Sequence, residues 1–152
     1  MKAYFLSLIF LLFTLTAFSQ LTGTVVRITD GDTFTLLTEE KQQVKVRLNG
    51  IDCPEAKQDF GQRARQYLSE LIFQKDVVIS ETSKDRYGRT LGTVHVGNIN
   101  VNETMVSSGM AWHYKQYSKD ERLGALENEA RDNKKGLWSQ PNPTPPWDYR
   151  KK

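Results

Sequence analysis

The chain has 152 residues, of which 38% are hydrophobic and 26% are charged, and its formal net charge is +3. This length gives room for one folded domain and excludes separate catalytic and regulatory domains. The charge permits a polyanionic partner without requiring one, and the single cysteine, Cys53, excludes an intramolecular disulfide.

The first residues carry the pattern of an export signal. Lys2 precedes a nearly unbroken apolar run from Ala3 to Phe18, and a small-x-small cleavage pattern follows at 17–19. The alternative is an uncleaved membrane anchor, but the run is shorter than the roughly 20 residues of a spanning helix. We therefore predict a signal peptide over residues 1–19, no membrane anchor after cleavage, and a protein that is secreted or periplasmic.

Alternating apolar and polar residues predict three strands in the next part of the chain. Thr22 to Thr29 and Thr33 to Leu37 flank an Asp-Gly-Asp turn and predict a hairpin. A third strand is expected over residues 44–49, where Val44, Val46 and Leu48 share one face. Arg47 is expected to point away from that face.

The rest of the chain predicts three helices and two more strands. Apolar residues recur at helical spacing in three segments, and two β-rich segments flank a polar turn. The expected helices are Phe60 to Phe73, Asn102 to Ser108 and Asp120 to Lys135, the last capped by Gly136, and the expected strands are Asp76 to Glu81 and Thr90 to Val96.

Because no strand-helix alternation persists, these elements predict a mixed α+β fold, a five-stranded OB-type β-barrel with about three α-helices. We expect the folded domain to cover residues 20–139 and to be a monomer. The four prolines of residues 140–152 predict a flexible, extended C-terminal tail without a helix.

Three groups of charged residues lie where the predicted strands end or turn, which is where sites are usually built. They are Asp30 to Thr33, Arg47 with Asp52 to Glu55, and Arg86 to Arg89. Each alone has a structural explanation, because Asp-Gly, Cys-Pro and Tyr-Gly are ordinary turn or strand-ending sequences. Together they supply what phosphodiester hydrolysis requires: ligands for a hard cation, a base for water, and cations for phosphate oxygens.

The acidic residues favour calcium over zinc as the metal. Two carboxylates from different loops suit calcium, which completes its coordination shell with backbone carbonyls and waters. The sequence contains no Cys and His cluster with the spacing of a zinc site.

The chain resembles the staphylococcal nuclease (thermonuclease) family, whose domain has an OB fold, in five ordered motifs, and the resemblance extends from Thr22 to Ser139. The motifs are Asp30 to Thr33, Arg47 through Asp52 to Glu55, Tyr87 to Arg89, Val101 to Glu103 and Gly136 to Trp138. The resemblance implies a calcium-dependent endonuclease that hydrolyses phosphodiester bonds of DNA, RNA or both by metal-assisted attack of water.

The resemblance also implies roles for the acidic motif residues. Asp32, Asp52 and the backbone carbonyl of Cys53 would bind calcium, and Glu55 would be the general base that activates water. Cys53 departs from the best-known member of the family, which has threonine there. A carbonyl ligand tolerates that change, whereas a thiol pointing into the site would make the enzyme sensitive to oxidation.

The resemblance also implies which residues would contact the phosphate and the bases of the nucleic acid. Arg47 and Arg89 would hold the scissile phosphate, and guanidinium groups match phosphate oxygens in a bidentate geometry. Trp112 and Tyr114 fall where the resembling nuclease has two tyrosines that flank the nucleotide, and Tyr87 follows the pattern of the turn. Their alternative role is packing in the core or at the rim of the site.

Two other functions compete with hydrolysis. A non-catalytic OB-type module would bind nucleic acid or protein, but it is expected to lose at least one of the five charged site residues, and all five are present. An exported calcium-binding structural protein would leave the arginines without a role.

Overall fold

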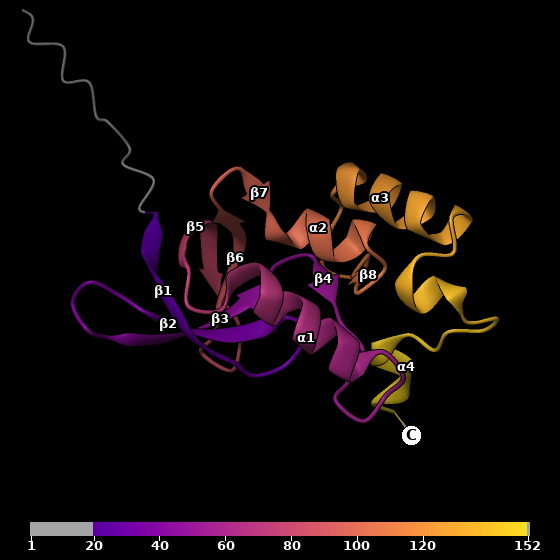
Figure 1. Cartoon of the computed structure of the whole chain (residues 1–152), viewed down its shortest axis with the longest axis horizontal. Helices are drawn as coiled ribbons and strands as arrows, with labels where there is room; N and C mark the ends of the chain where they lie inside the picture. The colour runs from indigo at the N-terminus through magenta and orange to yellow at the C-terminus, as the bar shows by residue number, and fades with distance from the viewer. Residues whose placement is uncertain (1–19, 152) are drawn as a thin grey trace, which may run out of the picture.

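A computed structural model describes residues 20–151 and contains a mixed β-barrel with helices on one side (Figure 1). The predicted five-stranded barrel with about three helices is confirmed. The predicted signal peptide, residues 1–19, lies outside the described residues. Within residues 20–151, no helix has the length and apolar character needed to cross a membrane.

The five long strands form the barrel in the order β3-β2-β1-β5-β6. They are β1 (Leu21–Ile28), β2 (Thr33–Leu37), β3 (Gln43–Leu48), β5 (Asp76–Lys84) and β6 (Thr90–Val96). Neighbours in this order are antiparallel, and a parallel pairing of β3 with β6 closes the barrel. Closure removes the exposed sheet edges that would otherwise pair with other chains.

Apolar side chains at alternate positions along the strands fill the barrel interior. Phe34 and Leu36 of β2 and Val46 and Leu48 of β3 are fully buried. Arg47 lies between the last two and is only partly buried, as the alternation predicted. The same pattern that buries the core therefore aims Arg47 toward the surface.

Two helices, α1 and α2, pack against the barrel, and the third, α3, packs on α2 (Figure 1). They are α1 (Gly61–Ile72), α2 (Val101–Ser107) and α3 (Glu121–Asp132). The buried face of α1 carries Ala64, Leu68 and Ile72, which are spaced one helical turn apart. Asn102 on α2 is buried and donates to the carbonyl of Asn49, which ties this helix to the end of β3.

Two boundaries lie three residues from the predicted ones, and the others differ by no more than one residue. β5 extends to Lys84, beyond Glu81, through a bulge in which Glu81 has φ 53°. α3 ends at Asp132, with Asn133 as its C-cap, and Lys134 then takes φ 51°. Gly136 is therefore not the helix cap. The backbone there packs so closely that a Cβ on Gly136 would lie 2.3 Å from the carbonyl oxygen of Gly109.

Several short elements were not predicted. They are β4 (Ile51–Asp52), which pairs with β8 (Trp112–His113), β7 (Ile99–Asn100), the 3₁₀ helix η1 (Gly136–Ser139) and α4 (Pro146–Tyr149). The prediction that the tail forms no helix is wrong. Pro146 occupies the first position of α4, where its missing N–H would have no helical partner in any case.

Candidate active site

The barrel brings the two predicted calcium ligands to one arginine. Arg47 pairs with Thr33 across β2 and β3, so it lies beside Asp32, the residue before β2. A tight turn after β3 then leads into β4, which carries Asp52. The backbone N–H of Leu48 donates to the carbonyl of Asp32 at 2.9 Å and fixes the start of β2 against β3.

Both carboxylates contact the same nitrogen atom of Arg47. Nη2 lies 3.3 Å from Asp32 Oδ2 and 3.0 Å from Asp52 Oδ1. Two further donors orient Asp32: the hydroxyl of Thr33 at 2.9 Å and the backbone N–H of Cys53 at 3.2 Å. Because one nitrogen contacts both carboxylates, their oxygens lie no more than two hydrogen-bond lengths apart.

Burial shapes the electrostatics of this cluster. Only 2% of the Asp52 side chain is exposed, and burial raises the pKa of Asp52 despite its bonds to arginines. Burial alone would lower the pKa of Arg47, but the charges of Asp32 and Asp52 outweigh this and raise it. Burial and the nearby charge of Asp32 raise the pKa of Asp30 to about 7. A buried group of carboxylates of this kind is stabilised by an added cation.

The available side chains fit a hard cation that also accepts backbone carbonyls and water as ligands. Within residues 20–151, no three His, Cys, Asp or Glu side chains come together as a metal site. Asp32 and Asp52 would therefore supply only two side-chain ligands to a metal, and backbone carbonyls and water would have to supply the others. Calcium accepts such a shell, whereas structural zinc sites need four side-chain ligands.

The Cys53 thiol lies in the hydrophobic core. Its side chain is buried, and the sulfur lies beside Gly31, where an added Cβ would come within 3.1 Å of it and 2.8 Å of Ala64 Cβ. Burial raises the pKa of this thiol well above its ordinary value. The sequence left the direction of the thiol open, and the structure places it away from solvent.

Glu55 lies on the loop between β4 and α1. Its side chain is 40% exposed, and its backbone N–H donates to Gln58 Oε1 at 3.1 Å. The Glu55 carboxylate accepts a hydrogen bond of 2.7 Å from Arg150 Nη1. The predicted general base is thus linked to the cluster through a residue of the tail.

Arg150 of the tail contacts the site, which the sequence did not predict. It forms a two-bond contact with Asp52, with Nη2 2.8 Å from Oδ2 and Nη1 3.3 Å from Oδ1. Hydrogen bonding to Asp52 raises the pKa of Arg150. A lone arginine in a proline-rich segment outside the family resemblance carries no local signal of such a contact.

Arg89 lies at the turn between β5 and β6. Its Nε is 2.7 Å from Asp85 Oδ2, and its guanidinium stands 5.5 Å from the centre of the Tyr87 ring. Thr90, the next residue, pairs with Val46, so the backbone of Arg89 lies at the start of the strand that pairs with the strand of Arg47. The structure joins Asp32 and Asp52 through Arg47, links Asp52 to Glu55 through Arg150, and pairs Arg89 with Asp85.

The three predicted aromatic residues have different surroundings. Tyr87 is 69% exposed, whereas Trp112 is 6% exposed and packs edge-on against Trp138, with ring centroids 4.4 Å apart. Tyr114 is half-buried and stacks on Trp147 of the tail, with centroids 5.2 Å apart and 3° between the ring planes. Trp112 is therefore part of a core cluster, and Tyr114 offers a flat ring at its edge.

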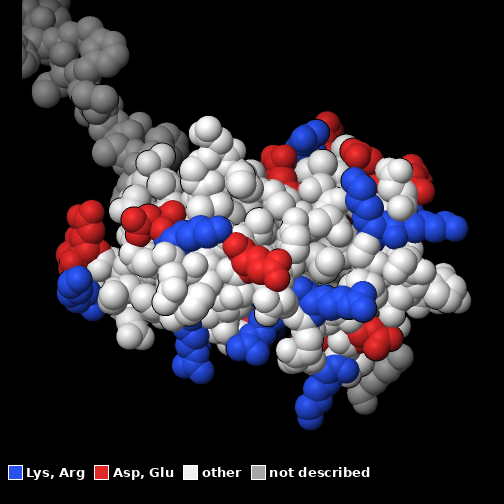
Figure 2. Space-filling view, in the orientation of Figure 1, with Lys and Arg blue, Asp and Glu red and all other residues white. Residues whose placement is uncertain are grey.

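Charges of both signs are mixed over the face of the molecule in Figure 2. Lys and Arg side chains are spread across it with Asp and Glu side chains between them. This agrees with the small net charge of the chain. Recognition of a polyanion on this face must therefore depend on local contacts more than on a broad positive field.

Comparisons with known proteins identify similar sequences over most of the chain. Residues 45–140 match the family described as Staphylococcal nuclease homologue. The chain is 47% identical over 146 residues to "Protein ParB" of Escherichia coli, covering 89% of this chain and 82% of that protein. It is 44% identical over 152 residues to "Micrococcal nuclease" of Shigella flexneri, covering 93% and 87%.

An "Uncharacterized endonuclease" of Escherichia coli O157:H7 is 45% identical over 129 residues, which cover 84% of each chain. The range matched to the family, 45–140, contains Arg47, Asp52, Glu55 and Arg89. Asp32 and Arg150 lie outside it.

Proposed function

The chain belongs to the staphylococcal nuclease family, and from this premise we propose that it is an exported, calcium-dependent endonuclease that hydrolyses DNA or RNA. The observation that carries the proposal is the contact of two buried carboxylates with one nitrogen of Arg47. A binding module has no need to hold two carboxylates together in this way, because closely placed like charges oppose each other.

Asp32 and Asp52 are the side chains that would hold calcium, with the backbone carbonyl of Cys53 as the further ligand that the family resemblance implies. Bound there, calcium would neutralise charge on the phosphate and polarise its P–O bonds. The bonds from Thr33 and from the Cys53 N–H keep Asp32 in place before any ion arrives. Such preorganisation lowers the cost of binding the ion.

Arg47 and Arg89 would bind the non-bridging phosphate oxygens. Arg47 is oriented by its two aspartates, and 14% of its side chain is exposed to a substrate. Asp85 accepts a hydrogen bond from Arg89 Nε, which fixes that side chain and leaves the Nη nitrogens to donate to phosphate. Two fixed guanidinium groups stabilise the charge that grows on these oxygens in the transition state.

Glu55 would accept a proton from the attacking water. Its carboxylate is partly exposed and lies next to the Asp52 site through their shared contact with Arg150. As the water oxygen bonds to phosphorus, its proton passes to Glu55, the bond to the leaving oxygen breaks, and the leaving oxygen takes a proton from solvent. A positioned carboxylate base contributes about 10² to 10⁴ in rate.

An assay of purified protein, starting at Gln20, tests the proposed function. Single-stranded DNA, duplex DNA and RNA are each incubated with calcium or with EGTA. We expect cleavage in calcium and intact substrate in EGTA. Intact substrate in calcium would favour the binding module, and cleavage in EGTA would contradict the calcium assignment.

Export is a separate part of the proposal and rests on the sequence of residues 1–19. The charged start, the apolar run and the small-x-small pattern are typical of a cleaved signal. Expression of the full chain in a bacterial host, followed by fractionation and N-terminal sequencing, tests it. We expect mature protein outside the cytoplasm that begins near Gln20, and full-length protein in the cytoplasm would contradict export.

A further inference from the structure

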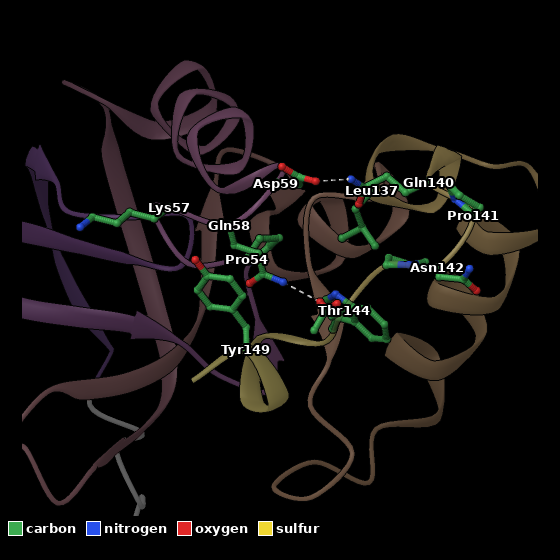
Figure 3. Close-up of a pocket in the computed structure, with 12 residues that line it drawn as sticks. Pro54, Lys57, Gln58, Asp59, Leu137, Gln140, Pro141, Asn142, Thr144 and Tyr149 are labelled. Carbon is green, nitrogen blue, oxygen red and sulfur yellow. Dashed lines mark hydrogen bonds between the residues drawn. The ribbon is translucent and has the colours of Figure 1, made fainter. Parts of the chain in front are cut away.

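The tail, residues 140–151, is tied to the loop that carries Glu55. Gln58 Nε2 donates to the carbonyl of Thr144 at 2.6 Å, and Gln140 Nε2 donates to Asp59 Oδ2 at 3.0 Å (Figure 3). A pocket of about 390 Å³ lies between this loop and the tail. These bonds bring the end of the tail, with α4, to the cluster around Asp52.

At its end, the tail places a positive charge on the proposed calcium ligands. The Arg150 guanidinium contacts both oxygens of Asp52 and one oxygen of Glu55. Each of these groups has a role in the proposed reaction that the contact blocks: Asp52 must bind the ion and Glu55 must accept a proton. Because both cations need the same Asp52 oxygens, calcium and Arg150 compete for them.

The tail makes a second contact, with the aromatic residues Trp112 and Tyr114 that the family resemblance places beside the nucleotide. The Trp147 indole lies parallel to the Tyr114 ring, and its centroid is 5.5 Å from that of Trp112. A parallel stack is the arrangement in which a nucleobase binds an aromatic side chain. Trp147 therefore occupies a face of Tyr114 that a nucleotide would use.

We propose that the tail is an inhibitory strap that occupies the site in place of its ligands, with Arg150 in place of calcium and Trp147 in place of a base. The inference rests on the proposed calcium site. The Arg150 side chain is 40% exposed although that of Asp52 is 2% exposed, so the guanidinium can leave toward solvent when an ion of higher charge takes its place. The strap therefore raises the calcium concentration that the nuclease needs, and it keeps the site closed below that concentration.

Calcium titrations of metal-free protein, without substrate, test this inference by isothermal calorimetry. Arg150→Ala removes the competing charge, and we expect its half-saturating calcium concentration to fall about five- to twentyfold. Lys151→Ala is the matched control, because Lys151 carries the same charge one residue further along and pairs with Asp148. We expect this control to bind calcium like the unmodified protein.

The rate of DNA cleavage at saturating calcium provides a second measurement. The strap predicts equal rates for Arg150→Ala and the unmodified protein, because saturating calcium has already displaced the tail. A tenfold slower variant with unchanged calcium affinity would overturn the strap and indicate that Arg150 assists the reaction.

Equal calcium affinities in all three proteins would also overturn the strap, but the calcium site would stand. If calcium bound to none of the three, the calcium site of the proposed function would fail and this inference with it.

Discussion

Arg47 Nη2 lies 3.0 Å from Asp52 Oδ1, and this contact joins the end of the third barrel strand to the short strand that follows it. The same nitrogen reaches Asp32, from a different part of the chain. One side chain thus contacts both carboxylates. Because both acids and the arginine are largely buried, each group depends on the others for compensation of its charge.

Replacing Arg47 with lysine is expected to reduce the catalytic rate strongly while the protein stays folded. Lysine keeps the positive charge near the aspartates, but a single ammonium cannot donate two parallel bonds to a phosphate. We expect kcat to fall by about 10²- to 10³-fold. Arg27→Lys, at an exposed position of β1, is the control and should leave the rate unchanged. A rate within threefold of the original would show that Arg47 does not bind the phosphate.

Glu55→Gln is expected to slow the reaction without weakening the calcium site. The amide retains the size of the side chain but cannot accept a proton, so kcat should fall by about 10²- to 10⁴-fold. Single-turnover kinetics at saturating calcium measure this loss, and calorimetry measures calcium affinity. Glu39→Gln, at an exposed turn, is the matched control. A variant that kept its full rate would show that another group takes the proton.

The Cys53 thiol is expected to resist chemical modification in the folded protein. It lies in the core, and burial raises its pKa, so the reactive thiolate is scarce as well as shielded. A chromogenic disulfide reagent should label it slowly in buffer and rapidly in denaturing urea. Fast labelling of the native protein would mean that the thiol opens toward the active site.

The contribution of His113 to the stability of the protein is expected to fall in mild acid. Burial lowers the pKa of this residue below its ordinary value of 6.5, so the folded state resists its protonation. The stabilisation from neutral His113 is complete above pH 6.5 and is lost as the pH falls through the lower pKa of the folded state. Urea unfolding of the wild type and of His113→Gln should therefore give free energies that converge between pH 7.5 and 5. A constant difference across that range would contradict this assignment.

The sequence was sufficient to predict the barrel and its three main helices, because long elements repeat their pattern several times. In β3, three alternations established which face Arg47 occupies. β4 and β8 have only two residues each, which is too short for any periodicity, and they form because Ile51 and Asp52 pair with His113 and Trp112. Neither segment alone predicts a tertiary pairing of this kind.

The site was predicted only in part, because a local pattern marks some of its residues and not others. Residues in recognisable motifs, such as Asp32 and Asp52, could be chosen from their chemistry and order. The partners of the tail could not, because 98 residues separate Arg150 from Asp52 and no local pattern links them. The proline-based prediction for the tail also failed at Pro146, where a first-turn proline starts a helix.

A crystal structure of the protein grown with excess calcium would show whether the two aspartates hold the metal. We expect one ion bound by carboxylate oxygens of both Asp32 and Asp52, with the guanidinium of Arg150 displaced from Asp52. An ion bound elsewhere, or Arg150 still paired with Asp52 in saturating calcium, would contradict this expectation.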